Sequence, residues 1–134
     1  MSDFAQAREQ QHAWKDREIA RAAVALVRAG LRELDAGQDF FGPDNLEAAI
    51  TFDGQGIVGS AVHMLREAHI IADCWAHRPE DGIIHGRRRS LRESANGRKV
   101  SLYTLVNRGI AEAFLRRHGE QVANQQAELF SVNA

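Results

Sequence analysis

The chain has 134 residues, of which 44% are hydrophobic and 26% charged, and its formal net charge is −1 at pH 7. These values are ordinary for one globular domain with its own core, and no apolar run is long enough to cross a bilayer. The N-terminus is polar and lacks the apolar segment of a signal peptide. A single cysteine, Cys74, excludes an internal disulfide, so we expect a cytoplasmic protein.

Apolar residues at helical spacing predict a helix over residues 16–36, for which Gly37 is a suitable stop. The preceding residues, 1–15, are rich in Ala and Gln. They either extend this helix or form a separate one that packs on another surface. The side chains expected to face inward from residues 16–36 are Ile19, Ala23, Leu26, Val27, Leu31 and Leu34.

Two further helices are expected before the midpoint of the chain. Pro43 suits a first helical turn and Asp44 complements the helix dipole, which predicts a short helix over residues 43–50. After the break at TFDGQG, a helix begins near Gln55 or Gly56. Its apolar stripe is Val58, Ala61, Val62 and Leu65, and its outward-facing residues are Gln55, Ser60, His63, Met64 and Glu67.

The second half of the chain has the patterns of strands and a hairpin. IIADCWAH, residues 70–77, is typical of a strand, and HRPEDG is typical of a turn. Asn96-Gly97 predicts a turn, and the alternation in KVSLYTLV predicts the strand after it. A final helix is expected over residues 107–134, with Ile110, Phe114, Leu115 and Val122 facing inward.

The charge is unevenly distributed over these elements. Residues 1–55 carry six Lys/Arg and ten Asp/Glu, whereas residues 56–99 carry eight and five. The basic excess lies in HGRRRSLRESANGRKVSLYTL, residues 85–105, which has six Lys/Arg and one acid. The distribution of charge is therefore more informative about partners than its sum.

The expected order is helix, short helix, helix, strand, basic hairpin, strand and helix. GPDNLEAAI would be a second helix, GIVGSAVHMLREAHII a third helix running into a strand, and VSLYTLV the end of the hairpin. With these motifs, residues 42–106 resemble a winged-helix domain, and the basic tail is similar to wings of small bacterial and phage-type members. The resemblance implies an α+β, mainly helical single domain over residues 1–134. Its parts would be a helical N-terminal extension (1–15), a winged-helix core (16–106) and a C-terminal helix (107–134).

A hairpin that carries cations outward is suited to the phosphate backbone of DNA, because each neutralised phosphate releases counterions. The resemblance therefore implies a DNA-binding protein, either a transcriptional regulator or a phage-type accessory protein. We expect double-stranded DNA and a second copy of the chain, in a homodimer, as partners, and no membrane. The candidate DNA-contacting residues are Gln55, Ser60, His63, Arg66, Arg87, Arg88, Arg89, Arg92, Arg98 and Lys99.

The third helix leaves a second interpretation open. Arg66 is its only basic residue apart from His63, and Glu67 would repel phosphates, which is a poor composition for reading bases. The domain could equally be a winged-helix module that binds a protein or RNA without sequence-specific DNA binding. Likewise, the apolar residues of the first and last helices could form a two-fold interface or close the monomer's own core, and periodicity favours neither.

We expect no metal, no cofactor and no enzymatic activity. Four histidines and Cys74 lie between residues 63 and 85, but their spacing matches no zinc motif. GQGIVG lacks the Lys-Ser/Thr of a phosphate-binding loop, and the sequence has no Gly-x-Ser-x-Gly motif. Histidines at a surface or an interface are the simpler interpretation.

Overall fold

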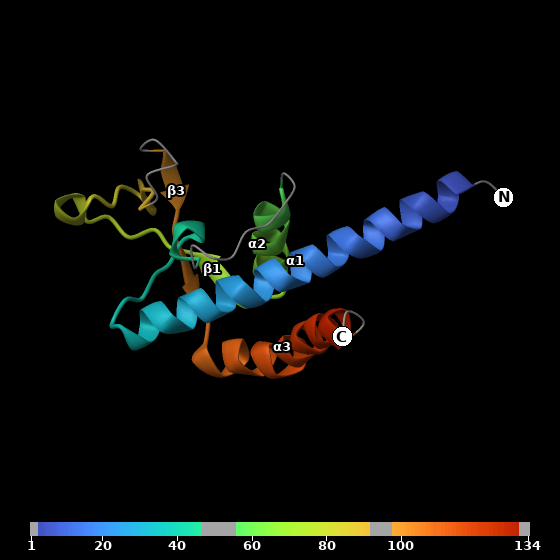
Figure 1. Cartoon of the computed structure of the whole chain (residues 1–134). Coiled ribbons are helices and arrows are strands. Elements are labelled where there is room, and N and C mark those ends of the chain that lie inside the picture. Colours follow the sequence, from blue (N-terminus) through green and yellow to red (C-terminus); the bar gives the residue numbers. More distant parts are fainter. Residues whose placement is uncertain (1–2, 47–55, 92–97, 132–134) are drawn as a thin grey trace.

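The computed structural model describes the backbone of residues 3–46, 56–91 and 98–131, and the side chains of residues 16–46, 56–91 and 98–119. The described part is α+β and mainly helical, with long helices at both ends, as expected (Figure 1). The elements in chain order are α1 (Asp3–Asp35), η1 (Pro43–Asn45), α2 (Ile57–Glu67), β1 (Ile71–Asp73), η2 (Pro79–Asp81), β2 (Arg87–Arg89), β3 (Lys99–Ser101), β4 (Tyr103–Leu105) and α3 (Arg108–Ser131).

Helix α1 confirms the predicted helix over residues 16–36, and residues 3–15 extend it rather than forming a separate helix. The inward stripe is Ala-rich, with Ala22, Ala23, Leu26 and Val27 fully buried. The helix stops because Gly37 adopts φ +89°, which lets Gln38 N–H donate to the Glu33 carbonyl at 2.8 Å. This bond satisfies a carbonyl that the helix end would otherwise leave without a partner.

Helix α2 begins after Gly56, which has φ +84°, as the glycine pattern predicts. Ala61, Val62 and Leu65 face the core as expected, and Ile57 is buried beside them. The helix ends at Glu67, and two residues later His69 takes the left-handed conformation (φ +58°) while Ile70 N–H donates to the Leu65 carbonyl at 2.9 Å.

The strands form two short antiparallel pairs. Strand β1 pairs with β4, with Ile71 opposite Leu105, and β2 pairs with β3, with Arg87 opposite Ser101. On the other edge of β4, the backbones of Phe41 and Tyr103 exchange two hydrogen bonds of 2.9 and 2.7 Å. Strand β4 therefore has a hydrogen-bonded neighbour on each edge, β1 on one and Phe41 on the other.

Several predicted boundaries differ from the structure. The strand predicted over residues 70–77 ends at Asp73, and the strand predicted over residues 99–106 is interrupted at Leu102. At the interruption, Leu102 N–H donates to the Gly86 carbonyl at 2.8 Å, so the chain bends from one strand pair to the other. Within the helix predicted over 43–50, the structure describes the 3-10 turn Pro43–Asn45, and residues 47–55 lie outside the described residues.

Two other expectations concern the hairpin turn and the last helix. Ser90 N–H donates to the Arg98 carbonyl at 2.9 Å, which continues the pairing one residue beyond β2 and β3, and Asn96-Gly97 lies outside the described residues. In α3, Phe114 and Leu115 pack against the core as expected, whereas Ile110 is 45% exposed. The side chain of Val122 lies outside the described residues.

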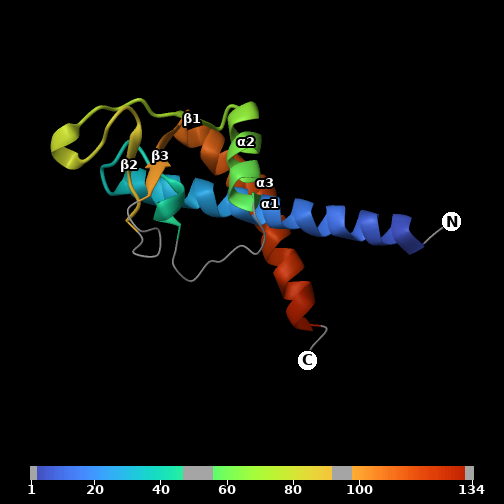
Figure 2. The ribbon, with the colours of Figure 1, turned by 90° about the horizontal axis from the view of Figure 1, so that it is seen from above.

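Helix α1 is central, with α2 on one side of it and α3 on the other (Figure 1). The main core lies between these helices and the β1–β4 pair, and a second small cluster consists of Phe40, Ile83 and Leu102. The N-terminal part of α1 projects beyond the other elements in both views (Figures 1 and 2). No described helix is both long and apolar enough to span a bilayer.

Candidate nucleic-acid interface

The β2–β3 hairpin has two chemically different faces. Side chains alternate along a strand, so Arg87 and Arg89 share one face, and Lys99 lies opposite Arg89 on that same face. All three side chains are exposed, and none of them forms an ion pair with a described residue. We call Arg87, Arg89 and Lys99 the basic face of the hairpin. Arg98, the next residue outward, is also exposed, and Arg92 lies outside the described residues.

Arg88 points the other way and is bound inside the molecule. Its Nη2 lies 3.2 Å from Asp44 Oδ1 and 2.7 Å from Asn45 Oδ1, and its guanidinium sits 5.8 Å from the centre of the Phe40 ring. The Asp44 side chain is only 1% exposed and that of Arg88 15%. Arg88 therefore differs from its neighbours. We reassign it from the phosphate-binding set to the anchoring of the hairpin, because releasing it would leave a buried carboxylate unpaired.

Asp44 and Asn45 extend this contact into a network. Asp44 Oδ2 accepts a hydrogen bond from Leu91 N–H at 3.0 Å, so the carboxylate holds both β2 and the residue that follows it. Asn45 Oδ1 also accepts from Gly42 N–H at 2.8 Å, and its Nδ2 donates to Glu33 Oε1 of α1 at 3.3 Å. The hairpin is thereby tied through η1 to the end of α1.

Sequence patterns do not indicate this network, because Asp44 lies more than forty residues from its partners Arg88 and Leu91. The local pattern predicts only that Asp44 complements a helix dipole. The available signal is the polar pair Asp44-Asn45, which follows the apolar dipeptide Phe40-Phe41 after two intervening residues. It does not identify the distant cation that Asp44 meets.

The outward face of α2 offers few free cations. His63 and Glu67 are exposed as expected, and Ser60 is half-buried. Arg66 is exposed, but its Nη2 lies 3.0 Å from Asp73 Oδ2 of β1. Gln55 lies outside the described residues. Among the candidate residues on the described part of α2, His63 and Ser60 therefore remain as hydrogen-bonding side chains outside any ion pair.

A groove of about 380 Å³ connects the end of α2 to the hairpin. It brings Arg66 and Arg87 to one surface although they are far apart in the sequence, and Tyr103 lines it as well. Burial raises the pKa of Tyr103 above its usual value, and the carboxylate of Asp73 raises it further. The phenol therefore remains a neutral hydrogen-bonding group at physiological pH.

Trp75 lines the same groove and was not among the candidate residues. It was expected inside a strand over residues 70–77, but β1 ends at Asp73 and the indole is 75% exposed. An exposed tryptophan beside arginines is able to stack on a base or to contact a protein partner. The early end of β1 is what places it at the surface.

The histidines have local roles in the structure. The rings of His77 and His85 lie 4.5 Å apart, and His77 Nδ1 accepts a hydrogen bond from His85 N–H at 3.4 Å. His69 lies two residues after the end of α2, in the left-handed conformation. Among the described residues, no three His, Cys, Asp or Glu side chains gather as a metal-binding group would require.

The hairpin and α2 lie on the same side of α1, and α3 lies on the opposite side (Figure 1). The view from above agrees, because α2 and the hairpin both lie in front of α1 there (Figure 2). The hairpin and α2 therefore belong to one side of the molecule.

Comparison of the chain with models of known protein families, with curated proteins and with solved structures finds no match. The geometry of the chain itself is thus the basis for assigning its function.

Proposed function

We propose that this protein is a winged-helix protein that binds double-stranded DNA, as a transcriptional regulator or a phage-type DNA-binding accessory protein. One observation carries the proposal: a hairpin with the exposed cations Arg87, Arg89 and Lys99 lies on the same side of α1 as the exposed face of α2. The order of elements supports it, since α2 runs almost directly into β1 and the hairpin then leads back to β4. This is the order on which the resemblance to winged-helix domains rests.

The hairpin supplies most of the affinity in this proposal. Arg87, Arg89, Lys99 and Arg98 contact phosphates, and each contact releases condensed counterions from the duplex. Four such contacts give a slope of log K against log salt of about −3 to −4 per chain. Arg88 contributes indirectly, because its pairing with Asp44 determines which way the neighbouring arginines face.

Helix α2 contributes less to the affinity and reads few bases. His63 and Ser60 are able to donate and accept hydrogen bonds at base edges, whereas Arg66 is already paired with Asp73. Gly59 has open space around its Cα, so the first turn of the helix allows a close approach of the backbone to DNA. We therefore expect strong salt dependence and modest sequence preference.

The test is a salt series of duplex binding, measured by fluorescence anisotropy of a labelled duplex. The variant Arg87→Gln/Arg89→Gln/Lys99→Gln is expected to lose about three units of the salt slope, because three phosphate contacts are removed. A matched control replaces three exposed arginines on α1 and α3, as Arg17→Gln/Arg28→Gln/Arg116→Gln, and should keep the slope. Equal losses in both variants, or no duplex binding by the original chain, would contradict the proposal.

We extend the proposal to a homodimer. Helix α1 has 33 residues and is about 50 Å long, and its N-terminal part has no described element beside it (Figures 1 and 2). A single helix in water is marginally stable unless another surface covers it. A second copy supplies that surface and doubles the phosphate contacts. Sedimentation equilibrium of the full chain tests this, and a monomer at tens of micromolar would contradict it.

A second candidate function is a winged-helix module for a protein or RNA partner. Trp75 and Leu91 favour it, because they are 75% and 67% exposed beside the hairpin, and exposed aromatic and aliphatic side chains are typical of interaction surfaces. Size-exclusion chromatography and pull-down from native extract distinguish the candidates. A stoichiometric partner that is lost on Trp75→Ala, together with absent duplex binding, would favour this second function.

A further inference from the structure

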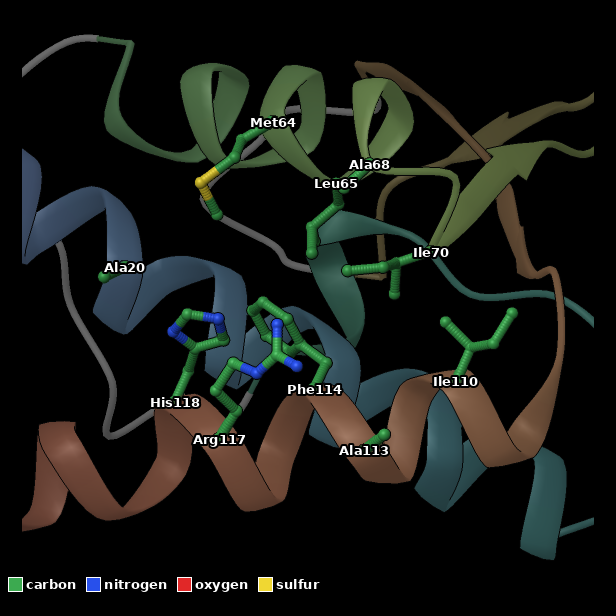
Figure 3. Close-up of a pocket in the computed structure, with 10 residues that line it drawn as sticks. All are labelled: Ala20, Met64, Leu65, Ala68, Ile70, Ile110, Ala113, Phe114, Arg117 and His118. Carbon is green, nitrogen blue, oxygen red and sulfur yellow. The ribbon is translucent and has the colours of Figure 1, made fainter.

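An apolar pocket of about 510 Å³ lies between α2 and α3, over the surface of α1 (Figure 3). Its volume is in the range of small-molecule sites in proteins. Helix α2 and the residue after its last turn supply one wall, α3 the opposite wall, and α1 the floor. The apolar residues that line it are Ala20, Met64, Leu65, Ala68, Ile70, Ile110, Ala113 and Phe114.

One end of this pocket is cationic. Arg117 and His118 complete its lining, and both head groups point toward the space beside the Phe114 ring (Figure 3). The His118 ring lies 4.6 Å from that of Phe114, which keeps the imidazole against the pocket wall. No acidic residue lines the pocket, and Arg117 forms no ion pair with a described residue. Within the described part of the chain, nothing neutralises the Arg117 charge, and a ligand anion would do so.

The apolar walls of the pocket are the second feature that a ligand would contact. Met64 of α2 lies above His118 at one end of the pocket and Ile110 of α3 lies below Ile70 at the other end (Figure 3), and Met64 and Ile110 remain 37% and 45% exposed. Isolated apolar side chains at a surface need no explanation, but these two belong to one concave surface with Phe114. An apolar group that fills the concavity removes this surface from water.

We propose that this pocket binds a small amphipathic anion, whose apolar body lies between Ile70 and Ile110 and whose carboxylate pairs with Arg117 beside His118. The complementarity is between an apolar groove with one cationic end and a ligand with the matching polarity. The guanidinium of Arg117 presents several donors to a carboxylate. This inference does not depend on DNA binding.

Three probes with the same ten-carbon chain and different head groups test the polarity of the site: decanoate, 1-decanol and decyltrimethylammonium. Amide chemical shifts of the full chain, followed by NMR, give both the location and the affinity. Decanoate should bind once per chain, shifting Ala68 and Ala113, and about tenfold more tightly than 1-decanol, since one charge-assisted contact is gained. Equal binding of the three probes, or no binding of decanoate, would overturn the proposal.

Two substitutions on α3 locate the charge effect. Arg117→Gln should weaken decanoate about tenfold and leave 1-decanol unchanged, because it removes the charge but keeps much of the side chain. Arg116→Gln is the matched control, since Arg116 is exposed and does not line the pocket, and it should leave both affinities unchanged. A loss of the same size in the control would overturn the assignment of Arg117.

A third substitution fills the pocket. Ala113 is exposed on α3, so Ala113→Phe should fold normally, as checked by circular dichroism, and should abolish binding of decanoate and of 1-decanol. The same variant separates a ligand site from an interface between copies of the chain. If Ala113→Phe converts a dimer to a monomer and the original chain does not bind decanoate, the pocket belongs to that interface and the proposal fails.

Discussion

The inner and outer halves of residues 99–105 are held to the rest of the molecule by different forces. The inner half, β4, pairs with β1 and packs on the main core, in which Leu26 and Leu65 are fully buried. The outer half, β3, belongs to the hairpin, which is anchored by the small Phe40 cluster and by the pairing of Arg88 with Asp44. Apolar burial therefore dominates the part formed by the three α-helices and the β1–β4 pair, which we call the body. A buried ion pair contributes much of the anchoring of the hairpin.

This difference explains why neighbouring arginines have different roles. A strand directs alternate side chains to opposite faces, so anchoring through Arg88 turns Arg87 and Arg89 outward together. One buried carboxylate thus determines the direction of at least two exposed cations. The body needs no such pairing, because its packing surfaces are apolar and uncharged.

The largest expected effect is on the body. Leu65→Ala removes a fully buried side chain from the centre of the main core and should lower the free energy of unfolding by about 2–5 kcal/mol. Urea denaturation followed by circular dichroism measures this loss. Leu91→Ala removes the same atoms from a residue that is 67% exposed, and its effect should stay within about 0.5 kcal/mol. Similar losses in the two variants would show that the core is not where the structure puts it.

Gly86→Ala should disturb the β2–β3 hairpin and leave the body folded. Gly86 has φ +74°, and a Cβ added there would lie 2.0 Å from the Cys74 carbonyl oxygen, so the backbone must move. We expect a loss of about 3 kcal/mol, near the upper end for single substitutions. In hydrogen exchange, amides of β2 and β3 should lose protection while those of α1 and α2 keep it. Uniform loss over the whole chain would mean that the two regions unfold as one unit.

Asp44→Asn tests the anchoring directly, because it removes the charge and keeps the shape. Arg88 would lose its buried ionic partner, which should cost about 1–3 kcal/mol. Asp39→Asn, at an exposed residue without a described ion pair, is the matched control and should be nearly neutral. If hairpin amides exchange no faster in Asp44→Asn than in the control, the ion pair does not hold the hairpin.

A smaller effect of opposite sign is expected at Gly59. A Cβ at this helical residue meets open space, so Gly59→Ala should stabilise the protein by about 0.5–1 kcal/mol. If α2 approaches DNA through its first turn, the same variant should bind a duplex more weakly despite its higher stability. Thermal unfolding and duplex titration on one preparation separate these effects. Unchanged duplex affinity would place the DNA away from the start of α2.

The smallest expected effect is a pH dependence at Tyr103, whose pKa burial raises. Above pH 10 the unfolded chain loses the phenolic proton first, so the stability should fall as the pH rises through 10 and toward the folded-state pKa. Tyr103 is the only tyrosine, so the ultraviolet absorbance of tyrosinate reports on it alone. The midpoint in buffer should lie above that in urea. Equal midpoints would contradict the burial of Tyr103 between the two regions.

The repeating patterns of the sequence predicted most of the helices and the positions of the strands. The helix stop at Gly37, the start at Gly56 and the stripe of Ala61, Val62 and Leu65 all follow from local rules. These features were predictable because a helix end or an apolar stripe depends on residues within one or two turns. Strand lengths were predicted less well, since Leu102 and Asp73 end strands through contacts with distant parts of the chain.

The sequence by itself determined that a cluster of cations follows a helix and a strand, because composition and alternation are properties of neighbouring residues. Only the tertiary structure decided which of those cations are free. Arg88 is held by Asp44 and Arg66 by Asp73, whereas the three residues of the basic face are exposed. The physical reason is that an ion pair depends on distance in space, and the folding of β2 onto η1 creates a proximity that is absent along the chain.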